Sequence, residues 1–289
     1  MSVVGENERL ANHAIFEHND PTIYELFHEN TKLNSYELKK LQHSLAMAVS
    51  NSDFKKASLN SGKCYPTLPR KNLLPKKKLS VAIDKVIWNR RSIRKFLPEN
   101  ISFQSLSTLL QYSSGISHTI VENNNGSQSG FRTYPSGGGL YPLEIYLVVN
   151  RVSDLQTGLY HYNVRENCLE KLLTKEELYS QLDKLHIRDQ LIKESGVTIL
   201  LTSVFKRSTY KYGDRGYRFV LMEVGHLSQN IALVSEALNL GSCNIGGYED
   251  DELNTLLQID GVSEAVVGEI AIGIPDLLGK NLMPDAIRE

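Results

Sequence analysis

A long amphipathic pattern in the last third of the chain restricts the fold more than any other segment. Apolar residues recur there in steps of four and three, at Val220, Val224, Leu227, Ile231, Val234 and Leu238. This spacing predicts a helix with one apolar face, and Gly241 supplies its stop. A helix with so much apolar surface must be covered, so we expect it in the core or at a subunit interface.

Short apolar segments and further helical patterns alternate along the same region. The segments expected as strands are 144–150, 159–163, 168–173, 197–205 and 268–275. Ser102 precedes a helical pattern that ends near Gly115, and Thr174 with Glu177 forms a capping box that opens another helix. We therefore predict an α+β domain over residues 81–289, with a central mixed sheet flanked by helices.

Residues 1–80 are more polar, and we expect a small, mostly helical N-terminal extension. Helical spacing is clearest at Leu38, Leu41, Leu45 and Val49. The extension ends in CYPTLPRKNLLPKKKLS (64–80), where three prolines and a charge run predict an extended connector. The polar stretch 122–130 predicts a mobile loop.

Composition argues against several classes of protein. The chain has 289 residues, of which 41% are hydrophobic and 22% charged, values typical of a soluble globular protein. A formal net charge of −1 gives no reason to expect nucleic acid as a partner. The three cysteines form no CxxC pair and the histidines lack metal-ligand spacing, so we expect no metal. Neither a signal peptide nor a membrane span is evident, and we expect a cytoplasmic protein.

The segment NRRSIRKF (89–96) places Arg90, Arg91, Ser92 and Arg94 close together. Guanidinium groups bind phosphate in a bidentate manner, so these residues are a candidate phosphate site. A solvated basic helix end is the alternative, and spacing alone slightly favours it.

Two glycine-rich segments are candidates for close contact with a flat ligand. In RTYPSGGGLYP (132–142), Gly137, Gly138 and Gly139 lack β-carbons and precede a strand. The run does not match the G-x-G-x-x-G dinucleotide motif, and the chain contains no Walker A motif. Gly246 and Gly247 form the second segment, after the long helix. The alternative for both is an ordinary turn, and nearby Cys243 is expected to be a buried structural thiol.

The segment YKYGDRGYRF (210–219) holds three tyrosines and three cations between a predicted strand and the long helix. Lys211 and Tyr212 could act as a proton-transfer pair. Taken alone, the segment is better explained as a solvated basic loop. His226, on the long helix but off its apolar stripe, is expected to be a hydrogen-bonded structural residue.

Together these motifs resemble the flavin-dependent nitroreductase superfamily, and within it the SagB-type dehydrogenases of thiazole/oxazole-modified peptide biosynthesis. The resemblance covers about residues 81–276 through RRSIRKF, YPSGGGLYPLEIYLV, GLYHYN, the segment 210–248 and VGEIAIGIP, in that order. FHENTK (27–32) also resembles an N-terminal signature of that branch.

The resemblance implies an α+β sandwich that dimerises, with FMN bound at the subunit interface. Arg90, Arg91, Ser92 and Arg94 would hold the FMN phosphate and ribityl chain. The isoalloxazine ring would lie near residues of the partner subunit's glycine run, which are Pro135, Ser136, Gly137, Gly138 and Gly139. Gly246 and Gly247 would offer N–H groups near flavin N5. Lys280 or Arg288 would add a phosphate contact, and the resemblance does not decide between them.

In this family branch a Lys-Tyr pair is implicated in catalysis, and Lys211-Tyr212 matches it. The implied reaction oxidises thiazoline or oxazoline rings of a precursor peptide, with oxygen reoxidising the flavin. The protein would work with a cyclodehydratase, and residues 1–80 would contact the peptide or that partner. One alternative is an NAD(P)H-dependent nitro-, quinone or dehydroamino-acid reductase of the same fold. Another is a flavin-free scaffold in a peptide-modifying complex.

Overall fold

The computed structural model describes residues 22–51, 62–121, 128–185 and 190–276. The chain divides into two compact units, residues 1–44 and 45–289. In the first unit, α2 (Ile23–Asn30) begins at Thr22, whose side chain and that of Glu25 form a capping box. Helix α3 (Ser35–Ser50) contains the predicted helical leucines and continues into the second unit. The expected N-terminal helices are therefore present.

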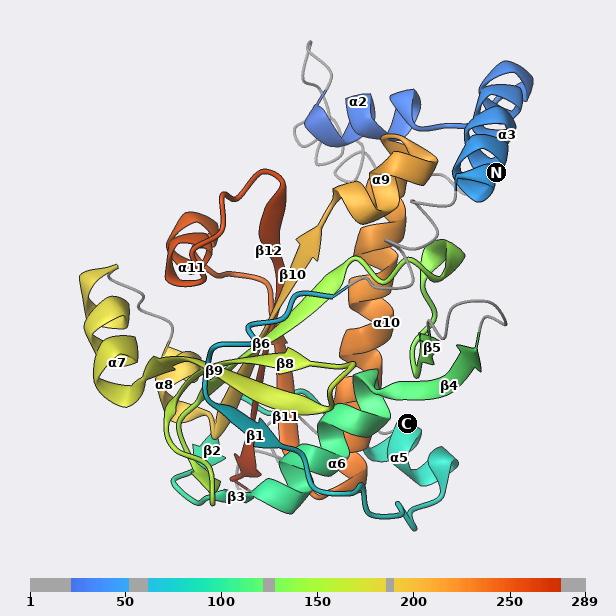
Figure 1. The fold of residues 1–289 in the computed structure, drawn as a ribbon. Coiled ribbons are helices and arrows are strands. Elements are labelled where there is room, and N and C mark those ends of the chain that lie inside the picture. Colours follow the sequence, from blue (N-terminus) through green and yellow to red (C-terminus); the bar gives the residue numbers. More distant parts are fainter. Residues whose placement is uncertain (1–21, 52–61, 122–127, 186–189, 277–289) are drawn as a thin grey trace, which may run out of the picture. The chain divides into compact units, whose positions relative to one another are not determined.

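The second unit is built on an eight-stranded sheet in the order β1-β9-β8-β6-β10-β12-β11, with β2 paired to β12 (Figure 1). Its strands are β1 (Arg70–Asn72), β2 (Phe96–Leu97), β6 (Leu143–Val149), β8 (Gly158–Asn163), β9 (Cys168–Thr174), β10 (Val197–Val204), β11 (Gly241–Ile245) and β12 (Glu264–Pro275). Every pairing between these strands is antiparallel, whereas a mixed sheet was expected. The predicted connector 64–80 contributes β1, which pairs with β9.

Helices cover both faces of this sheet. They are α5 (Ile83–Asn89), α6 (Phe103–Ser114), α7 (Lys175–Lys184), α8 (Gln190–Glu194), α9 (Lys206–Tyr212), α10 (Arg215–Ala237) and α11 (Asp250–Leu256). Ser102 accepts a hydrogen bond from the Ser105 N–H and starts α6, and Thr174 caps α7, as predicted. Two small sheets complete the unit, β3 (Ile101–Ser102) with β7 (Val152–Ser153) and β4 (Ile116–Val121) with β5 (Gln128–Arg132).

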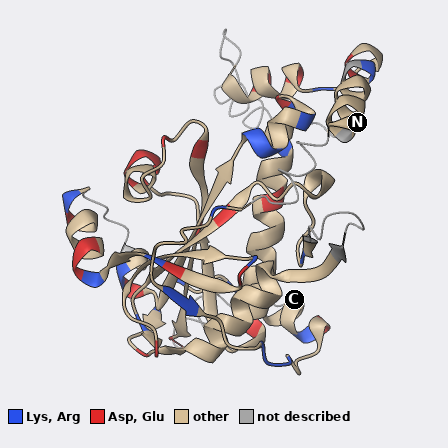
Figure 2. Ribbon diagram, viewed as in Figure 1, with Lys and Arg blue, Asp and Glu red and all other residues tan. Residues whose placement is uncertain are grey.

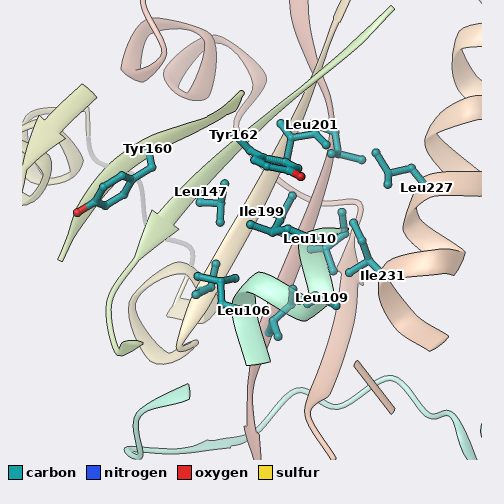
Figure 3. Packing of buried hydrophobic residues seen from close by; sticks show 14 of the residues in the cluster. Leu106, Leu109, Leu110, Leu147, Tyr160, Tyr162, Ile199, Leu201, Leu227 and Ile231 are labelled. Carbon is teal, nitrogen blue, oxygen red and sulfur yellow. The ribbon is translucent and has the colours of Figure 1, made fainter. Parts of the chain in front are cut away.

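Successive side chains along a strand point to opposite faces of the sheet, so each face has its own set of buried residues. On one face, Leu147, Ile199 and Leu201 pack against Leu110 of α6 and Ile231 of α10 (Figure 3). The predicted long helix is α10, and it covers this face of the core. The fold is therefore the predicted α+β arrangement.

The opposite face has its own apolar cluster. Tyr146, Val148 and Leu200 pack there with Leu178 of α7 and Leu253 of α11. This second cluster accounts for the nearly continuous apolar sequence of the central strands, which are buried on both sides.

The segment 210–219 was expected to be a loop, and this expectation was wrong. Tyr210, Lys211 and Tyr212 form the last turn of α9, and α10 begins at Arg215. Gly213 separates the two helices with a φ of 57°, a backbone conformation that glycine adopts at little cost. A rigid helix end therefore carries the Lys-Tyr pair.

Three further expectations concern particular segments. Residues 122–127 of the predicted mobile loop lie outside the described residues, and 128–130 belong to β5. Cys243 is buried, as expected. None of the described helices combines the length and apolar character that crossing a membrane requires.

Candidate active site

The Lys-Tyr pair and the glycine run, far apart in sequence, meet in the structure. A β-carbon placed on Gly138 would lie 2.5 Å from Tyr212 Oη and 2.7 Å from Lys211 Nζ. Both side chains are half-buried, and within the described part of the chain neither polar end has a hydrogen-bonding partner. Lys211 Nζ also lies 5.2 Å from the centre of the Tyr212 ring. Two unpaired, titratable groups thus converge on one point of the backbone.

The conformation of the glycine run explains why it needs glycine. Residues Gly137–Gly139 form a single 3₁₀ turn, in which Gly138 and Gly139 both have a φ of 68°. Residues with a β-carbon are disfavoured there. At Gly138, the close approach of the Lys-Tyr pair is a second reason. The ordinary-turn alternative therefore does not account for this position.

Helix α10 forms the wall behind the run. A β-carbon on Gly137 would lie 3.3 Å from Phe219 Cβ, and the Phe219 ring packs edge-on against the Tyr212 ring at 4.8 Å. One turn further along α10, Glu223 Oε2 accepts a hydrogen bond of 2.5 Å from Ser136 Oγ. Glu223 is 2% exposed. Burial raises the pKa of Glu223 to about 7, although the Ser136 hydrogen bond and nearby Arg132 oppose the shift.

Sequence reasoning missed Glu223, although a signal was present. Glu223 lies three residues after Val220 and four before Leu227, so the sequence alone places it beside the apolar stripe. A carboxylate that shares a helix face with buried residues is uncommon unless it has a specific role. His226, on the same helix, is exposed, and its Nδ1 lies 3.4 Å from the Pro135 carbonyl oxygen.

The arginine cluster lies at the end of α5. Arg90 is its C-cap and half-buried, whereas Arg91 and Arg94 are exposed. Arg91 Nη1 donates to the carbonyl oxygens of Trp88 and Arg90, at 2.8 Å each. Among the described residues, the side chains of Arg90 and Arg94 have no hydrogen-bonding partner. Two guanidinium groups are therefore available to an anion.

The cluster is anchored to the start of β11. Ser92 forms a parallel bridge with Ser242, and the Ile93 N–H donates to the Ser242 carbonyl at 2.9 Å. A β-carbon on Gly241 would lie 2.9 Å from Ile93, which is buried. The arginines consequently lie near the C-terminal end of α10, which leads into β11 (Figure 1).

Gly246 and Gly247 directly follow β11 and are exposed. A β-carbon on either glycine would meet no atom within 4 Å, and neither has a φ in the left-handed region. The described protein therefore gives no steric reason for glycine here. Close approach of a ligand to the backbone would explain why glycine occurs at these two positions.

Helix α10 separates the two halves of the predicted site. The Lys-Tyr pair and glycine run lie at its N-terminal end, and the arginines lie at its C-terminal end. Its 23 residues span about 34 Å at 1.5 Å per residue. The structure thus brings Lys211, Tyr212 and the glycine run together, but not Arg90 or Arg94.

A polar cluster on the opposite face of the sheet also reaches α9. His161 is fully buried between Glu144 and Glu170, with 3.0 Å from each ring nitrogen to a carboxylate oxygen. Glu144 forms an ion pair of 2.6 Å with Arg207 of α9, and Glu170 one of 3.0 Å with Arg70 of β1. Figure 2 shows basic residues on both α9 and β1. Sequence reasoning did not identify this cluster, which fixes one face of α9 to the sheet.

Two predictions on site residues remain. Lys280 and Arg288, the candidate additional phosphate contacts, lie outside the described residues. Within the described ranges, no group of three or more His, Cys, Asp or Glu residues is arranged to hold a metal ion.

Comparison with known proteins gives a consistent picture. The model of the nitroreductase family matches residues 87–274. A nitroreductase-like protein of Methanocaldococcus jannaschii is 31% identical over 179 residues, which cover 62% of this chain and 85% of that protein. A solved structure of a nitroreductase-like protein from Anabaena variabilis has a TM-score of 0.67 at 26% identity, covering 92% of this chain and 49% of the other.

Two relatives are named for peptide processing. The trifolitoxin-processing protein TfxB of Rhizobium leguminosarum bv. trifolii is 26% identical over 183 residues, covering 61% of this chain and 48% of TfxB. The microcin B17-processing protein McbC of Escherichia coli is 31% identical over 135 residues, covering 45% of this chain and 49% of McbC. The chain thus spans about half the length of these two relatives and of the Anabaena chain.

Proposed function

Because the chain belongs to the nitroreductase family, a family of flavin oxidoreductases, we propose that it is an FMN-dependent azoline dehydrogenase. In this proposal it oxidises thiazoline or oxazoline rings of a ribosomal peptide to thiazole or oxazole. The observation that carries the proposal is the convergence of Lys211 Nζ and Tyr212 Oη on Gly138. The similarity to two peptide-processing proteins supports the choice of a peptide substrate.

The residues present fit FMN. Arg90 and Arg94 have unpaired guanidinium groups that would hold its phosphate, with Arg91 and Ser92 beside them. Gly246 and Gly247 have open space at the β-carbon position and would give their N–H groups to the ring. When bound, FMN would supply the hydride acceptor. The run from Pro135 to Gly139 would face the ring from the other side.

In the proposed mechanism, Lys211 and Tyr212 handle the proton. Lys211 would accept the Cα proton of the azoline ring at Nζ, which requires its neutral form, and Tyr212 Oη would orient the ring or pass that proton on to solvent. Packing of Phe219 against Tyr212 and the ion pair of Arg207 with Glu144 would hold α9 in place. A positioned general base contributes about 10²–10⁴-fold to the rate.

The test is direct oxidation of an azoline-containing peptide by the purified, FMN-loaded protein in air. We expect mass spectrometry to show the loss of two hydrogens per ring. Lys211→Ala should abolish this loss while the protein keeps its yellow flavin. Lys206→Ala, an exposed lysine on the same helix, is the matched control and should be fully active. Normal turnover by Lys211→Ala would exclude the lysine as base.

A second proposal is that two chains complete each site. Because the arginines and the Lys-Tyr pair lie at opposite ends of α10, whose 23 residues span about 34 Å, one bound FMN would take Arg90 from one chain and Lys211 from its partner. Arg90→Ala and Lys211→Ala proteins should each be inactive, but subunit exchange should restore about a quarter of wild-type activity, since half of the dimers would have one intact site of two. No recovery, despite verified subunit exchange, would place both groups in the same chain's site.

An NAD(P)H-dependent reductase of the same fold is the alternative that the Methanocaldococcus relative favours. Anaerobic NADPH should bleach the bound flavin quickly in that case, whereas the dehydrogenase should be bleached only by an azoline peptide. A colourless protein that takes up no FMN would instead favour the scaffold.

We also propose that the protein acts in a complex with a cyclodehydratase, and that residues 1–80 contact the peptide or this partner. Support comes from the family resemblance and from the separate compact unit at the N-terminus. Deleting residues 1–44 should raise the KM for the peptide while leaving FMN binding unchanged. An unchanged KM would argue against a role in peptide binding.

A further inference from the structure

Glu223 is a buried acid whose role the proposed reaction does not explain. It lies on α10 four residues after Phe219, and so on the same side of the helix. Phe219 contacts the glycine run, and Glu223 reaches Ser136 at the start of that run. The carboxyl group is therefore directly behind the backbone that Lys211 and Tyr212 approach from α9.

Ser136 connects this acid to the shape of the run. Its Oγ donates to Glu223 Oε2 at 2.5 Å and accepts the Tyr141 N–H at 2.9 Å. Tyr141 has a φ of 45°, and Gly138 and Gly139 have a φ of 68°. The serine hydroxyl thus closes a stretch with three left-handed residues, and Glu223 fixes which way that hydroxyl points. Moving the carboxyl group would break the first of these bonds and leave the hydroxyl free to rotate.

The second oxygen of the carboxyl group is buried without a partner. Glu223 Oε1 has no hydrogen bond within the described residues. Burying an ionised carboxylate with a bare oxygen is costly, whereas a proton on that oxygen removes the charge. The charged or titratable groups that interact with Glu223 are Arg132, Tyr134 and Tyr141. His226 lies at Pro135, and Lys211 and Tyr212 lie at Gly138, further along the glycine run.

Arg132, the nearest buried cation, is committed elsewhere. Its Nη1 donates to Tyr134 Oη at 2.9 Å and to the Leu143 carbonyl at 3.3 Å, and it forms no ion pair with Glu223. The positive charge of Arg132 lowers the free energy required to ionise Glu223 but does not offset the whole effect of burial. Burial therefore remains the larger effect, as the raised pKa of about 7 indicates.

We propose that Glu223 is a proton-switched positioning residue, which as a neutral carboxylic acid holds Ser136 and the glycine run in the shape that accepts the cofactor. Loss of its proton places a negative charge behind the backbone that would face the ring and weakens the binding of FMN. This inference rests on the proposed function only in taking FMN as the ligand. It assigns Glu223 no contact with the substrate.

The first experiment needs no cofactor. With a pKa of about 7, Glu223 of the folded protein holds its proton up to about that pH, whereas a glutamate in the unfolded chain loses it near its ordinary pKa of 4.5. Protons bound only in the folded state make stability fall as pH rises between these values. We expect the unfolding midpoint of the apo-protein, relative to Glu223→Gln, to decrease from about pH 5 to 7. Glu249→Gln, at an exposed position, should show no such difference.

The second experiment measures FMN affinity against pH. If only the neutral form binds, the Kd of the wild type should rise by up to about tenfold per pH unit above about pH 7. Glu223→Gln, which keeps an acceptor and is always neutral, should bind FMN tightly and independently of pH in this range. Below about pH 7, where Glu223 is neutral, Ser136→Ala and Glu223→Ala should both bind FMN more weakly than the wild type.

The outcomes separate this inference from the proposed reaction. A pH step in stability that Glu223→Gln abolishes would support the switch even if no azoline peptide is oxidised. Identical pH profiles of wild type and Glu223→Gln in the stability experiment would overturn it. If Glu223→Ala weakens FMN binding but Ser136→Ala does not, the positioning does not act through the serine and the inference is wrong.

Discussion

The contact between the glycine run and the Lys-Tyr pair can be tested by adding one carbon atom. In Gly138→Ala, the new β-carbon would stand 2.5 Å from Tyr212 Oη and 2.7 Å from Lys211 Nζ. Carbon atoms in contact are normally separated from their neighbours by about 3.5–4.0 Å, so both side chains must move. These are the ends of flexible side chains, and the protein can fold around the change. The pair, however, can no longer occupy its present position.

Gly139→Ala is the matched control. Gly139 has the same φ of 68°, but its β-carbon would meet nothing closer than Phe131 Cε1 at 3.9 Å. The left-handed conformation costs a residue with a β-carbon about 1–2 kcal/mol in either variant. We therefore expect similar losses of stability from the two substitutions. Only Gly138→Ala should displace the Lys-Tyr pair.

The predicted difference lies in the rate of azoline oxidation. If Lys211 is the base, displacing it forfeits a contribution of about 10²–10⁴-fold, so at equal flavin occupancy Gly138→Ala should be much slower than Gly139→Ala. Urea unfolding would compare stability, and flavin absorbance would confirm that both variants hold FMN. Equal activity of the two variants at equal flavin occupancy would refute the assignment of the pair to catalysis.

Two further predictions concern stability. His161 and Arg207 hold the pKa of Glu144 at about 2 against the effect of burial, so the ionised carboxylate should stabilise the fold by roughly 3 kcal/mol at neutral pH, and this contribution is lost as pH falls from about 4.5 to 2. In urea unfolding, the loss of stability caused by Glu144→Gln at pH 7 should therefore be smaller at pH 3, and an equal loss at both pH values would contradict this. Thr174→Ala removes the capping box of α7 and should cost about 1 kcal/mol in the same assay, whereas an unchanged midpoint would mean that the cap contributes nothing.

The regular elements were predictable because their signals are local. Helix α10 follows its apolar spacing, and α6 and α7 begin at residues whose side chains cap them. Helix α9 was missed because it lacks such a local signal. Its sequence KRSTYKY has no apolar period, and it is stabilised by contacts distant in sequence, such as the ion pair of Arg207 with Glu144. The pairing of β1 with β9 likewise joins segments about a hundred residues apart.

The site was predictable in its parts but not in its arrangement. Lys211, Tyr212 and Gly138 were identified from motifs, yet sequence spacing could not show that they touch. Glu223 carried a readable signal, because an acid on an apolar stripe must be explained. The signal at Glu144 was weaker: a strand that is buried on both faces has no solvent-facing side, so an acid in its sequence indicates a buried polar contact.

Each part of the proposed site lies next to helix α10 or is connected to it in sequence. Its first residues follow the Lys-Tyr pair, Phe219 and Glu223 contact the glycine run, and its C-terminal end leads to the strand that anchors the arginines. In the proposed function, the arginines that would bind phosphate and the pair that would transfer a proton lie at opposite ends of this helix, which is about 34 Å long. If two chains complete each site, as we propose, their pairing would bring these two ends together, and the end of α9 that carries Lys211 and Tyr212 would supply the proton chemistry. Because activity depends on the residues of a site rather than on the fold, the proposal is best tested at α9 and Glu223.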